Sequence, residues 1–300
     1  MDYSQILSQQ FNIKEEYAKN IITLLDDGNT IPFIARYRKE MHGSMDDQLI
    51  REFAEKLEYL RGLDKRRDEI RSLIDAQEKL TDEINIALDK AATLSELEDI
   101  YRPYRPKRKT RASIAKEKGL EPLANDILKQ EKGFDPSKSA VDYIDEEKGV
   151  TSVEDAIQGA MDIIAELVSD NAEIRKRIRN LTNANGVLVS VATDEEKDSV
   201  YKNYYDYKEP VKKIAGHRVL AVNRGEKEGF LKVSVETDSE KPLNSIFRAM
   251  ITDKNQLCSD IIREACTDAY QRLIYPSIER EVRNDLTDTA SENAMKVFAV

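Results

Sequence analysis

Apolar residues recur at steps of three and four positions through most of the chain, which is the spacing of helices buried along one face. The longest such run covers residues 45–78. A helix of that length would be on the order of 50 Å long at 1.5 Å per residue, so we expect it to act as a strut. Gly62 and the polar residues 64–69 are where we expect it to bend or leave the core.

Shorter helices are predicted on both sides of this strut. Residues 3–27 have the pattern of two helices closed by Gly28. Between residues 81 and 130 the predicted helices are short and sharply punctuated, with Thr81 as one cap and Ser95 with Glu98 as a capping box. Several short helices with tight turns indicate a helix-turn-helix-like module.

The period of the pattern changes in the second half of the chain. Residues 187–191, 201–207 and 230–235 alternate and are rich in β-branched and aromatic residues, which predicts a small antiparallel sheet. A short helix ended at Gly225 is expected between the last two strands. From residue 242 the pattern is helical again, and we expect Tyr275-Pro276 to break it.

We therefore predict a mainly α protein: a multi-helix array with a long strut helix, an inserted helix-turn-helix-like module and a small antiparallel β-sheet. The last residues, 294–300, are apolar and have no cap, so we expect the natural chain to continue beyond them. The predicted segments are an N-terminal helical region at 1–78, the inserted module at 79–134, a helical region at 135–185, a β-containing subdomain at 186–237 and C-terminal helices at 238–300.

Composition narrows the classes of protein that remain. The 300 residues include 40% hydrophobic and 35% charged residues, with a net charge of -10, which is typical of a charge-rich globular protein. No apolar run reaches the roughly 18 to 20 residues needed to cross a bilayer, and the first residues lack the basic lead and apolar core of a signal peptide. We expect a cytoplasmic protein with no membrane partner.

The residues that usually carry catalysis or metal binding are sparse. Cys258 and Cys266 are spaced by two helical turns, which suits neither a disulfide within one helix nor a zinc site, so we expect free thiols. His42 and His217 have no cysteine near them. We find no phosphate-cradling glycine loop and no nucleophile with a histidine motif. We expect no metal, no cofactor and no catalysis by these residues.

One short stretch stands out against the acidic total. From Arg102 to Arg111, which we call the basic segment, six cationic side chains occur in ten residues without an acid, and two prolines prevent a continuous helix. Interleaved tyrosines add aromatic faces, a composition typical of nucleic-acid-facing loops. The candidate nucleic-acid-binding residues are Arg102, Tyr104, Arg105, Lys107, Arg108, Lys109, Arg111 and Lys116.

An ordinary structural role is the alternative for each charged or aromatic stretch. The basic segment can equally be a solvated turn or pair with acids of the same chain. Arg36, Arg38 and Lys39 around Tyr37 can meet a phosphate or pair with a neighbouring helix. The basic helix predicted at residues 171–183 is better explained as a solvated face, and the tyrosines at 201–207 as packing residues.

Three stretches in order resemble the Tex family of bacterial transcription accessory proteins: IPFIARYRKE from Ile31, EDIYRPYRPKRKTRASIAKEKGLEPLA from Glu98, and HRVLAVNRGEKEGFLKV from His217. The resemblance covers essentially the whole chain. It implies a cytoplasmic protein related to a eukaryotic transcription elongation factor, with a mostly helical N-terminal region interrupted by a helix-turn-helix-like insertion. It also implies a continuation, absent here, into an RNase H-like domain of the YqgF type, helix-hairpin-helix elements and an OB-fold RNA-binding domain.

Two functions follow from the residues and the resemblance together. The first is a scaffold and nucleic-acid-binding region that acts in transcription or RNA metabolism through weak phosphate contacts of the basic segment, with RNA or DNA as the partner. The second is a protein-interaction scaffold that docks RNA polymerase or a ribosomal partner without binding nucleic acid directly.

Overall fold

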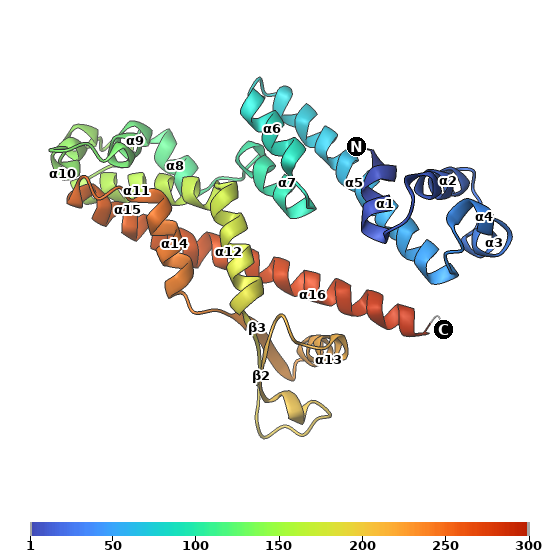
Figure 1. Cartoon of the computed structure of the whole chain (residues 1–300). Helices are drawn as coiled ribbons and strands as arrows, with labels where there is room; N and C mark the ends of the chain where they lie inside the picture. Colours follow the sequence, from blue (N-terminus) through green and yellow to red (C-terminus); the bar gives the residue numbers. More distant parts are fainter. Residues whose placement is uncertain (1, 299–300) are drawn as a thin grey trace. The chain divides into compact units, whose positions relative to one another are not determined.

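A computed structural model describes residues 2–298, and describes the side chains as far as residue 294 (Figure 1). The described residues form two compact units that meet in sequence between Tyr104 and Arg105. Each unit has its own hydrophobic core, so each is described by itself.

The first unit is entirely helical among its described residues, because its apolar positions keep the three- and four-residue spacing throughout. Its elements are α1 (Tyr3–Phe11), α2 (Glu15–Asp26), α3 (Ile31–Tyr37), α4 (Lys39–His42), α5 (Asp47–Asp75), α6 (Asp82–Lys90), α7 (Leu94–Tyr101) and the 3₁₀ helix η1 (Arg102–Tyr104).

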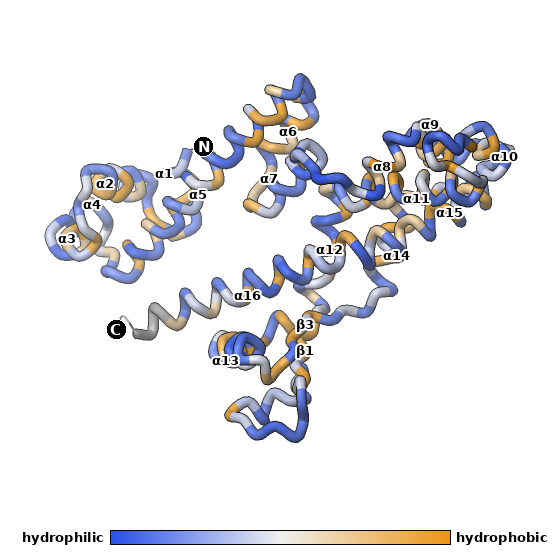
Figure 2. Tube along the Cα trace, turned by 180° about the vertical axis from the view of Figure 1, so that it is seen from behind, coloured by the Kyte–Doolittle hydropathy of each residue, from blue (hydrophilic) through white to orange (hydrophobic). Residues whose placement is uncertain are grey.

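The predicted strut is α5, an uninterrupted helix of 29 residues. Asp46 caps it by accepting a hydrogen bond of 2.8 Å from the backbone N–H of Leu49. Its buried side chains serve two cores: the first half packs with α1 to α4, and the second half packs with α6 and α7. Short runs of polar and apolar residues alternate along it in Figure 2, as one buried face requires. Gly62 lies within the helix and does not interrupt it.

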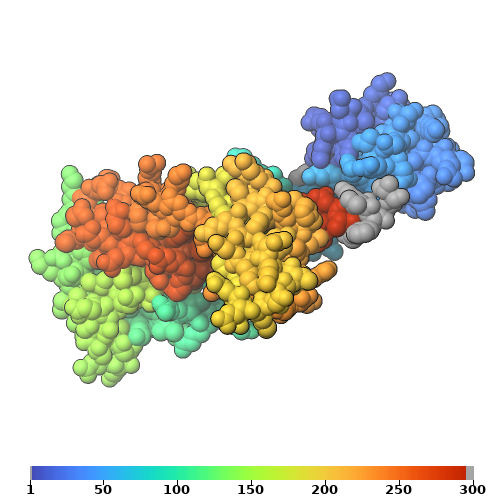
Figure 3. Space-filling model, turned by 90° about the horizontal axis from the view of Figure 1, so that it is seen from below, coloured from blue at the N-terminus to red at the C-terminus, as the bar shows by residue number. Residues whose placement is uncertain are grey.

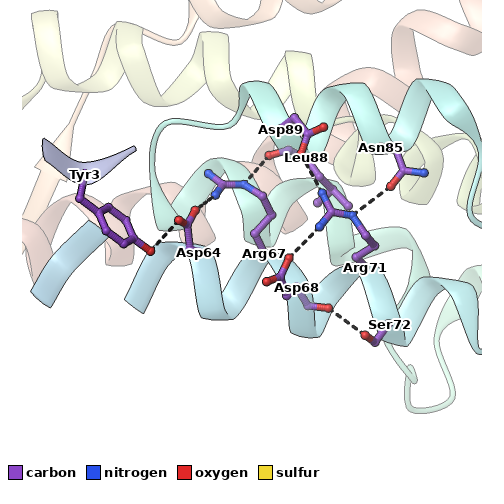
Figure 4. A network of polar contacts seen from close by, with 9 residues as sticks. All are labelled: Tyr3, Asp64, Arg67, Asp68, Arg71, Ser72, Asn85, Leu88 and Asp89. Carbon is purple, nitrogen blue, oxygen red and sulfur yellow. Dashed lines mark hydrogen bonds and ion pairs between the residues drawn. The ribbon is translucent and has the colours of Figure 1, made fainter. Parts of the chain in front are cut away.

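A polar network joins the second half of α5 to its neighbours (Figure 4). Buried Arg67 forms an ion pair with Asp64 and donates to the carbonyl oxygens of Leu88 (2.8 Å) and Ala91 (3.0 Å) at the end of α6. Tyr3 of α1 donates to the same Asp64 at 2.8 Å. Arg67 therefore satisfies carbonyls that the end of α6 leaves without helical partners.

The caps of α6 and α7 confirm one sequence prediction and correct another. Thr81 caps α6 as predicted, accepting from the backbone N–H of Ile84 at 3.3 Å. The predicted box of Ser95 with Glu98 is wrong, because Thr93 accepts from the N–H of Glu96 at 3.2 Å and the Glu96 carboxylate accepts from Ala92 at 2.7 Å. Both boxes have the same spacing, and α7 uses the one that begins two residues earlier.

The second unit combines helices with the small sheet. Its helices are α8 (Arg111–Glu117), α9 (Glu121–Lys129), α10 (Pro136–Ala140), α11 (Val153–Asp170), α12 (Ala172–Asn185), α13 (Gly216–Lys227), α14 (Glu240–Met250), α15 (Gln256–Asp268) and α16 (Tyr275–Phe298). Short elements are the 3₁₀ helices η2 (Val141–Tyr143) and η3 (Lys202–Tyr204) and the π-helical segment η4 (Ala269–Ile274). The strands are β1 (Val187–Ala192), β2 (Asp206–Pro210) and β3 (Leu231–Glu236).

Helix α11 lies at the centre of the large core of this unit. It contacts α8, α9, α10, α12 and α15, and its buried face carries small residues that allow close approach. A Cβ built on Gly159 would lie 2.3 Å from the Leu120 side chain, so any larger residue requires that side chain to move. Figure 3 shows one face of this unit, where the yellow surface of the β-containing part adjoins the orange surface of the helices near α14.

The sheet is antiparallel with the order β2-β1-β3, so the first strand lies in the middle. In its register Val189 of β1 faces Lys208 on one side and Ser234 on the other. A smaller core between the sheet and α13 contains the tyrosines of residues 201–207, of which Tyr201 is buried and the others partly so. The packing role predicted for these tyrosines is therefore confirmed.

Two of the predicted boundaries near the sheet are wrong. The second strand begins at Asp206 and not at Tyr201, because residues 202–204 form a 3₁₀ turn that places tyrosines in the core. Helix α13 does not end at Gly225 but continues to Lys227. A Cβ on Gly225 would lie 2.5 Å from Leu231, so this glycine is required by close packing, and the chain turns at Gly229 with φ of +79°.

The predicted break at Tyr275-Pro276 is also wrong. Backbone hydrogen bonding continues from α15 through the π-helical η4 into α16, and Pro276 lies in the first turn of α16. Proline lacks an N–H, and the wider turn just before it accommodates that loss without ending the helix. The Tyr275 hydroxyl donates to the Val235 carbonyl oxygen, and burial beside Glu279 raises the pKa of Tyr275 to about 12.

The basic helix α12 is not a solvated face, which corrects a further expectation. Arg175 is fully buried, and its Nη2 donates to Ser277 (2.9 Å) and Glu281 (3.0 Å) of α16. Arg179, 8% exposed, donates to the same carboxylate at 2.9 Å. Two of the cations predicted to face water thus join α12 to α16.

The prediction of a mainly α fold with a small antiparallel sheet is confirmed. The helices of the predicted helix-turn-helix-like module are divided between the units: α6 and α7 pack in the first, and α8 and α9 pack in the second. The module and the predicted segment boundaries stay predictions. Across residues 2–298 no helix is both long and apolar enough to span a membrane. The predicted apolar chain end lies outside the described side chains from residue 295 onward.

Candidate nucleic-acid interface

The basic segment crosses the point at which the two units meet in sequence. Arg102 and Tyr104 belong to the first unit, in η1 directly after α7. The Tyr104 ring packs against the core that α5 shares with α6 and α7, and its carbonyl oxygen accepts a hydrogen bond of 2.9 Å from Gln77. The local fold therefore uses Tyr104 as a packing residue, and its predicted stacking role stays a prediction.

The rest of the segment belongs to the second unit and begins with Arg105, which is exposed. Lys107 has two carboxylate partners on α11: it forms an ion pair with Asp170, and its Nζ lies 3.5 Å from Glu166. Both acids are mostly buried, at 12% and 19% exposed, while the Lys107 side chain is 30% exposed, so the contact ties the segment to α11 at the surface.

The remaining cations near the segment are more exposed. Lys109 lies 3.7 Å from Glu117, with both side chains about two-thirds exposed, and Lys116 lies 3.2 Å from Glu121. Such surface pairs contribute little and are exchanged readily for other anions. Arg108 and Arg111 are exposed and have no ion-pair partner within the described part of the chain.

Helix α8 determines where the segment ends. Thr110 accepts from the backbone N–H of Ser113 at 3.0 Å, and the Ser113 hydroxyl accepts from the N–H of Thr110 at 2.8 Å. This reciprocal cap starts the helix at Arg111 and leaves the two preceding cations on non-helical backbone. Burial raises the pKa of Asp162 on α11, and the positive charge of Arg111 partly offsets that rise.

The structure thus brings Arg108, Lys109 and Arg111 together as exposed cations, which we call the cationic trio. Sequence reasoning missed the partners of Lys107, because Glu166 and Asp170 are distant in sequence. Their spacing of four residues on a helix was the one available signal, since it places two acids on the same face. Among residues 2–298 we find no cluster of three His, Cys, Asp or Glu side chains suited to a metal ion.

A mainly helical fold with a short cationic surface segment defines a class of charge-rich helical protein. Residues 1–75 match the family model of the Tex-like protein N-terminal domain, and residues 131–298 match that of the Tex central region. The second match covers more than half of the chain. The chain belongs to the Tex family.

Named relatives agree with this assignment. The chain is 43% identical to the uncharacterised protein YdcI of Bacillus subtilis, covering all of this chain and 43% of YdcI. It is 35% identical to the transcriptional accessory protein Tex of Neisseria gonorrhoeae, again over the whole chain and 40% of that relative. It is 30% identical, over 99% of its length, to the human S1 RNA-binding domain-containing protein 1, of which it covers 31%. The chain therefore spans less than half the length of these relatives.

Proposed function

We propose that this chain is a scaffold and nucleic-acid-binding region of a bacterial transcription accessory protein, acting in transcription or RNA metabolism through weak phosphate contacts. Family membership supports the role, since one relative is named a transcriptional accessory protein and another an S1 RNA-binding domain-containing protein. The single observation that carries the proposed contacts is the exposure of the cationic trio in a chain with a net charge of -10.

The cationic trio is better suited to bind an external phosphate than to pair with carboxylates of this chain. Lys107 is held by Glu166 and Asp170 and anchors the segment, whereas Arg108 and Arg111 extend into solvent. Arginine donors match phosphate oxygens in a bidentate geometry. Three contacts are few, and the acidic remainder of the surface repels a polyanion, so we expect weak binding that is sensitive to salt.

The test is fluorescence anisotropy of labelled single- and double-stranded RNA and DNA across a salt series. Changing Arg108, Lys109 and Arg111 to glutamine is expected to reduce the log–log salt slope on duplex DNA by about 3, since each phosphate contact contributes about 0.9. The matched control changes Lys129, Lys132 and Lys138, three exposed lysines of the same unit, to glutamine. Equal losses in the two variants would show that only net charge matters and would contradict the proposal.

A protein-interaction scaffold is the second candidate, with RNA polymerase or a ribosomal partner as the docked protein. The observation that favours it is that Lys107, Lys109 and Lys116 each face a carboxylate of this same chain. If the wild-type chain binds none of the four nucleic acids at moderate salt, this second function replaces the first.

We further propose that these 300 residues have no catalytic activity of their own. The proposal rests on the sequence, which lacks a nucleophile motif and a phosphate-cradling glycine loop. Incubation with labelled RNA and DNA in the presence of magnesium or manganese should leave the substrates intact. Cleavage that copurifies with the folded chain would overturn this proposal.

A further inference from the structure

A second cationic surface lies in the first unit, where α3 meets α4 (Figure 1). Five consecutive or nearly consecutive side chains at this corner are exposed. The backbone leaves the helical conformation at Arg38, whose φ is -129° and ψ is 35°. Helix α3 ends before this residue and α4 begins after it. We call this surface the corner patch, and it consists of Phe33, Arg36, Tyr37, Arg38 and Lys39.

The aromatic side chains of the patch face outward. Ile34 is fully buried and fixes the inner side of α3, while Phe33 and Tyr37 are 38% and 62% exposed. Their ring centroids are 5.4 Å apart with planes tilted by 42°. Because residues 36 and 37 lie three and four positions after residue 33 on α3, Arg36 and Tyr37 are both neighbours of Phe33 on the helix surface.

The cations of the patch have no acidic partner. Arg38 places its guanidinium 5.9 Å from the centroid of the Phe33 ring, and neither it nor Arg36 nor Lys39 forms an ion pair with any described residue. This arrangement differs from the basic segment, where Lys107 and Lys109 face carboxylates.

The corner is supported from beneath, so the patch is presented on a fixed backbone. Buried His42 places its Nε2 3.0 Å from the Ile34 carbonyl oxygen, and Asn20 of α2 donates to the Met41 carbonyl oxygen at 3.1 Å. Gly43 follows with φ of +67°, and a Cβ there would lie 2.7 Å from the Tyr17 ring. Rigid support lowers the entropic cost of binding a flexible ligand.

We propose that the corner patch is a binding site for single-stranded nucleic acid. A base stacks on the exposed Tyr37 ring, and Arg36, Arg38 and Lys39 contact the phosphates on either side of it. Exposed rings next to unpaired cations are the elements of single-strand binding, since stacking needs an unpaired base and the cations follow the backbone. A duplex hides its base faces, and an acidic peptide uses only the cations, so both use the patch less fully.

The proposal does not depend on the function proposed for the cationic trio, because the patch lies in the other unit. Binding is therefore measured in the full chain that already carries Arg108→Gln, Lys109→Gln and Arg111→Gln. The probes are labelled oligouridylate and oligothymidylate, followed by anisotropy across a salt series. We expect this parent chain to retain measurable single-strand binding.

Three variants of the parent test the two kinds of contact. Tyr37→Ala is expected to weaken binding about 5- to 150-fold, the range for loss of one stacked base, whereas Tyr37→Phe keeps the ring and retains affinity. Changing Arg36, Arg38 and Lys39 to glutamine is expected to lower the single-strand salt slope by about 2, at about 0.7 per phosphate. Tyr37 is mostly exposed, so its loss leaves the fold intact.

The matched control is a second aromatic and cation pair in the same unit, an exposed tyrosine with a half-buried lysine. Lys56 lies 4.8 Å from the centroid of the Tyr59 ring on α5, and Tyr59 is 43% exposed. Lys56→Gln with Tyr59→Ala removes a ring and a charge without touching the patch, and binding should be unchanged.

Each of three other results would overturn the inference. Loss of all binding in the parent chain leaves the trio as the site and excludes the patch. Equal effects of Tyr37→Ala and of the Lys56 and Tyr59 control would show that stacking at Tyr37 is not specific. Binding of a labelled polyglutamate peptide that exceeds binding of both oligonucleotides would assign the patch to an acidic protein partner instead.

Discussion

Two buried arginines and one glutamate join α12 to α16 in the second unit. Arg175 and Arg179 lie one turn apart and share the Glu281 carboxylate, at distances near 3 Å. Such a contact is costly to break, because removal of the carboxylate takes away part of what compensates the charges of two buried arginines. The cost of losing a partner is much smaller at the surface, because water solvates the charge that remains.

Glu281→Ala is therefore expected to lower the free energy of unfolding by about 3 to 5 kcal/mol. The matched variant is Asp26→Ala, which removes the partner of Arg61 from a pair whose side chains are 49% and 41% exposed, and should cost about 1 kcal/mol or less. Urea unfolding followed by circular dichroism measures both. Similar costs for the two variants would contradict the importance assigned to burial.

The acidic partners of individual cations could not be predicted from the sequence. The basic composition of α12 was plain, but Glu281 lies more than a hundred residues away, and a helix face alone does not reveal what covers it. Lys107 gave the same difficulty, since Asp170 is 63 residues distant. The candidate residues were identified as cations, and only the three-dimensional contacts separate the anchoring Lys107 from the exposed trio.

At the scale of elements, two helical glycines show how surroundings decide the effect of a substitution. Gly62 lies in α5 with no atom within 4 Å of a built Cβ, whereas a Cβ on Gly159 in α11 would lie 2.3 Å from Leu120 and 3.4 Å from Ala115. Alanine has the higher helix propensity at both positions. Because the space around the two glycines differs, we expect substitutions by alanine to have opposite effects on stability.

Gly62→Ala is expected to stabilise the chain by about 0.5 to 1 kcal/mol, because it lowers the entropy of the unfolded state. Gly159→Ala is expected to destabilise it by about 1 to 3 kcal/mol, because α8 and the Leu120 side chain must move away from α11. Thermal unfolding of both variants beside the wild type is the measurement. A stabilising Gly159→Ala would show that the close contact relaxes at no cost.

Most elements could be predicted from periodicity, and the exceptions share a cause. The long helix, the paired N-terminal helices and two of the three strands follow from local spacing of apolar residues. The misplaced boundaries at Tyr201, Gly225 and Tyr275 lie where residues typical of strands, turns or breaks are used for packing. Tertiary contacts override local propensity at such positions.

At the scale of the whole molecule, the chain is two compact units connected within the basic segment. Each unit has cores of its own, and the segment after Tyr104 has no regular structure until α8 begins at Arg111. Backbone of this kind, exposed and outside helices, is where proteases act first. The prolines that follow Arg102 and Arg105 protect those two bonds from trypsin.

Brief digestion with trypsin is therefore expected to cut after Arg108 or Lys109 and to leave two products, residues 1–108 or 1–109 and the remainder. Lys107 should be cut more slowly, because its side chain is engaged with Asp170 and Glu166. Intact-mass spectrometry of timed samples identifies the products. Early cleavage within α5 or α11 would contradict the division into two units.

The π-helical segment between α15 and α16 makes residues 256–298 a single rod, about 60 Å long at the helical rise. A wider turn changes the phase of every side chain that follows it. Upstream the rod meets α9, α11 and α14, and downstream it meets α12, α13 and β3. The π-helical segment therefore sets the angle about the helix axis between the side chains that pack on the helices upstream and those that pack on α12, α13 and β3 downstream.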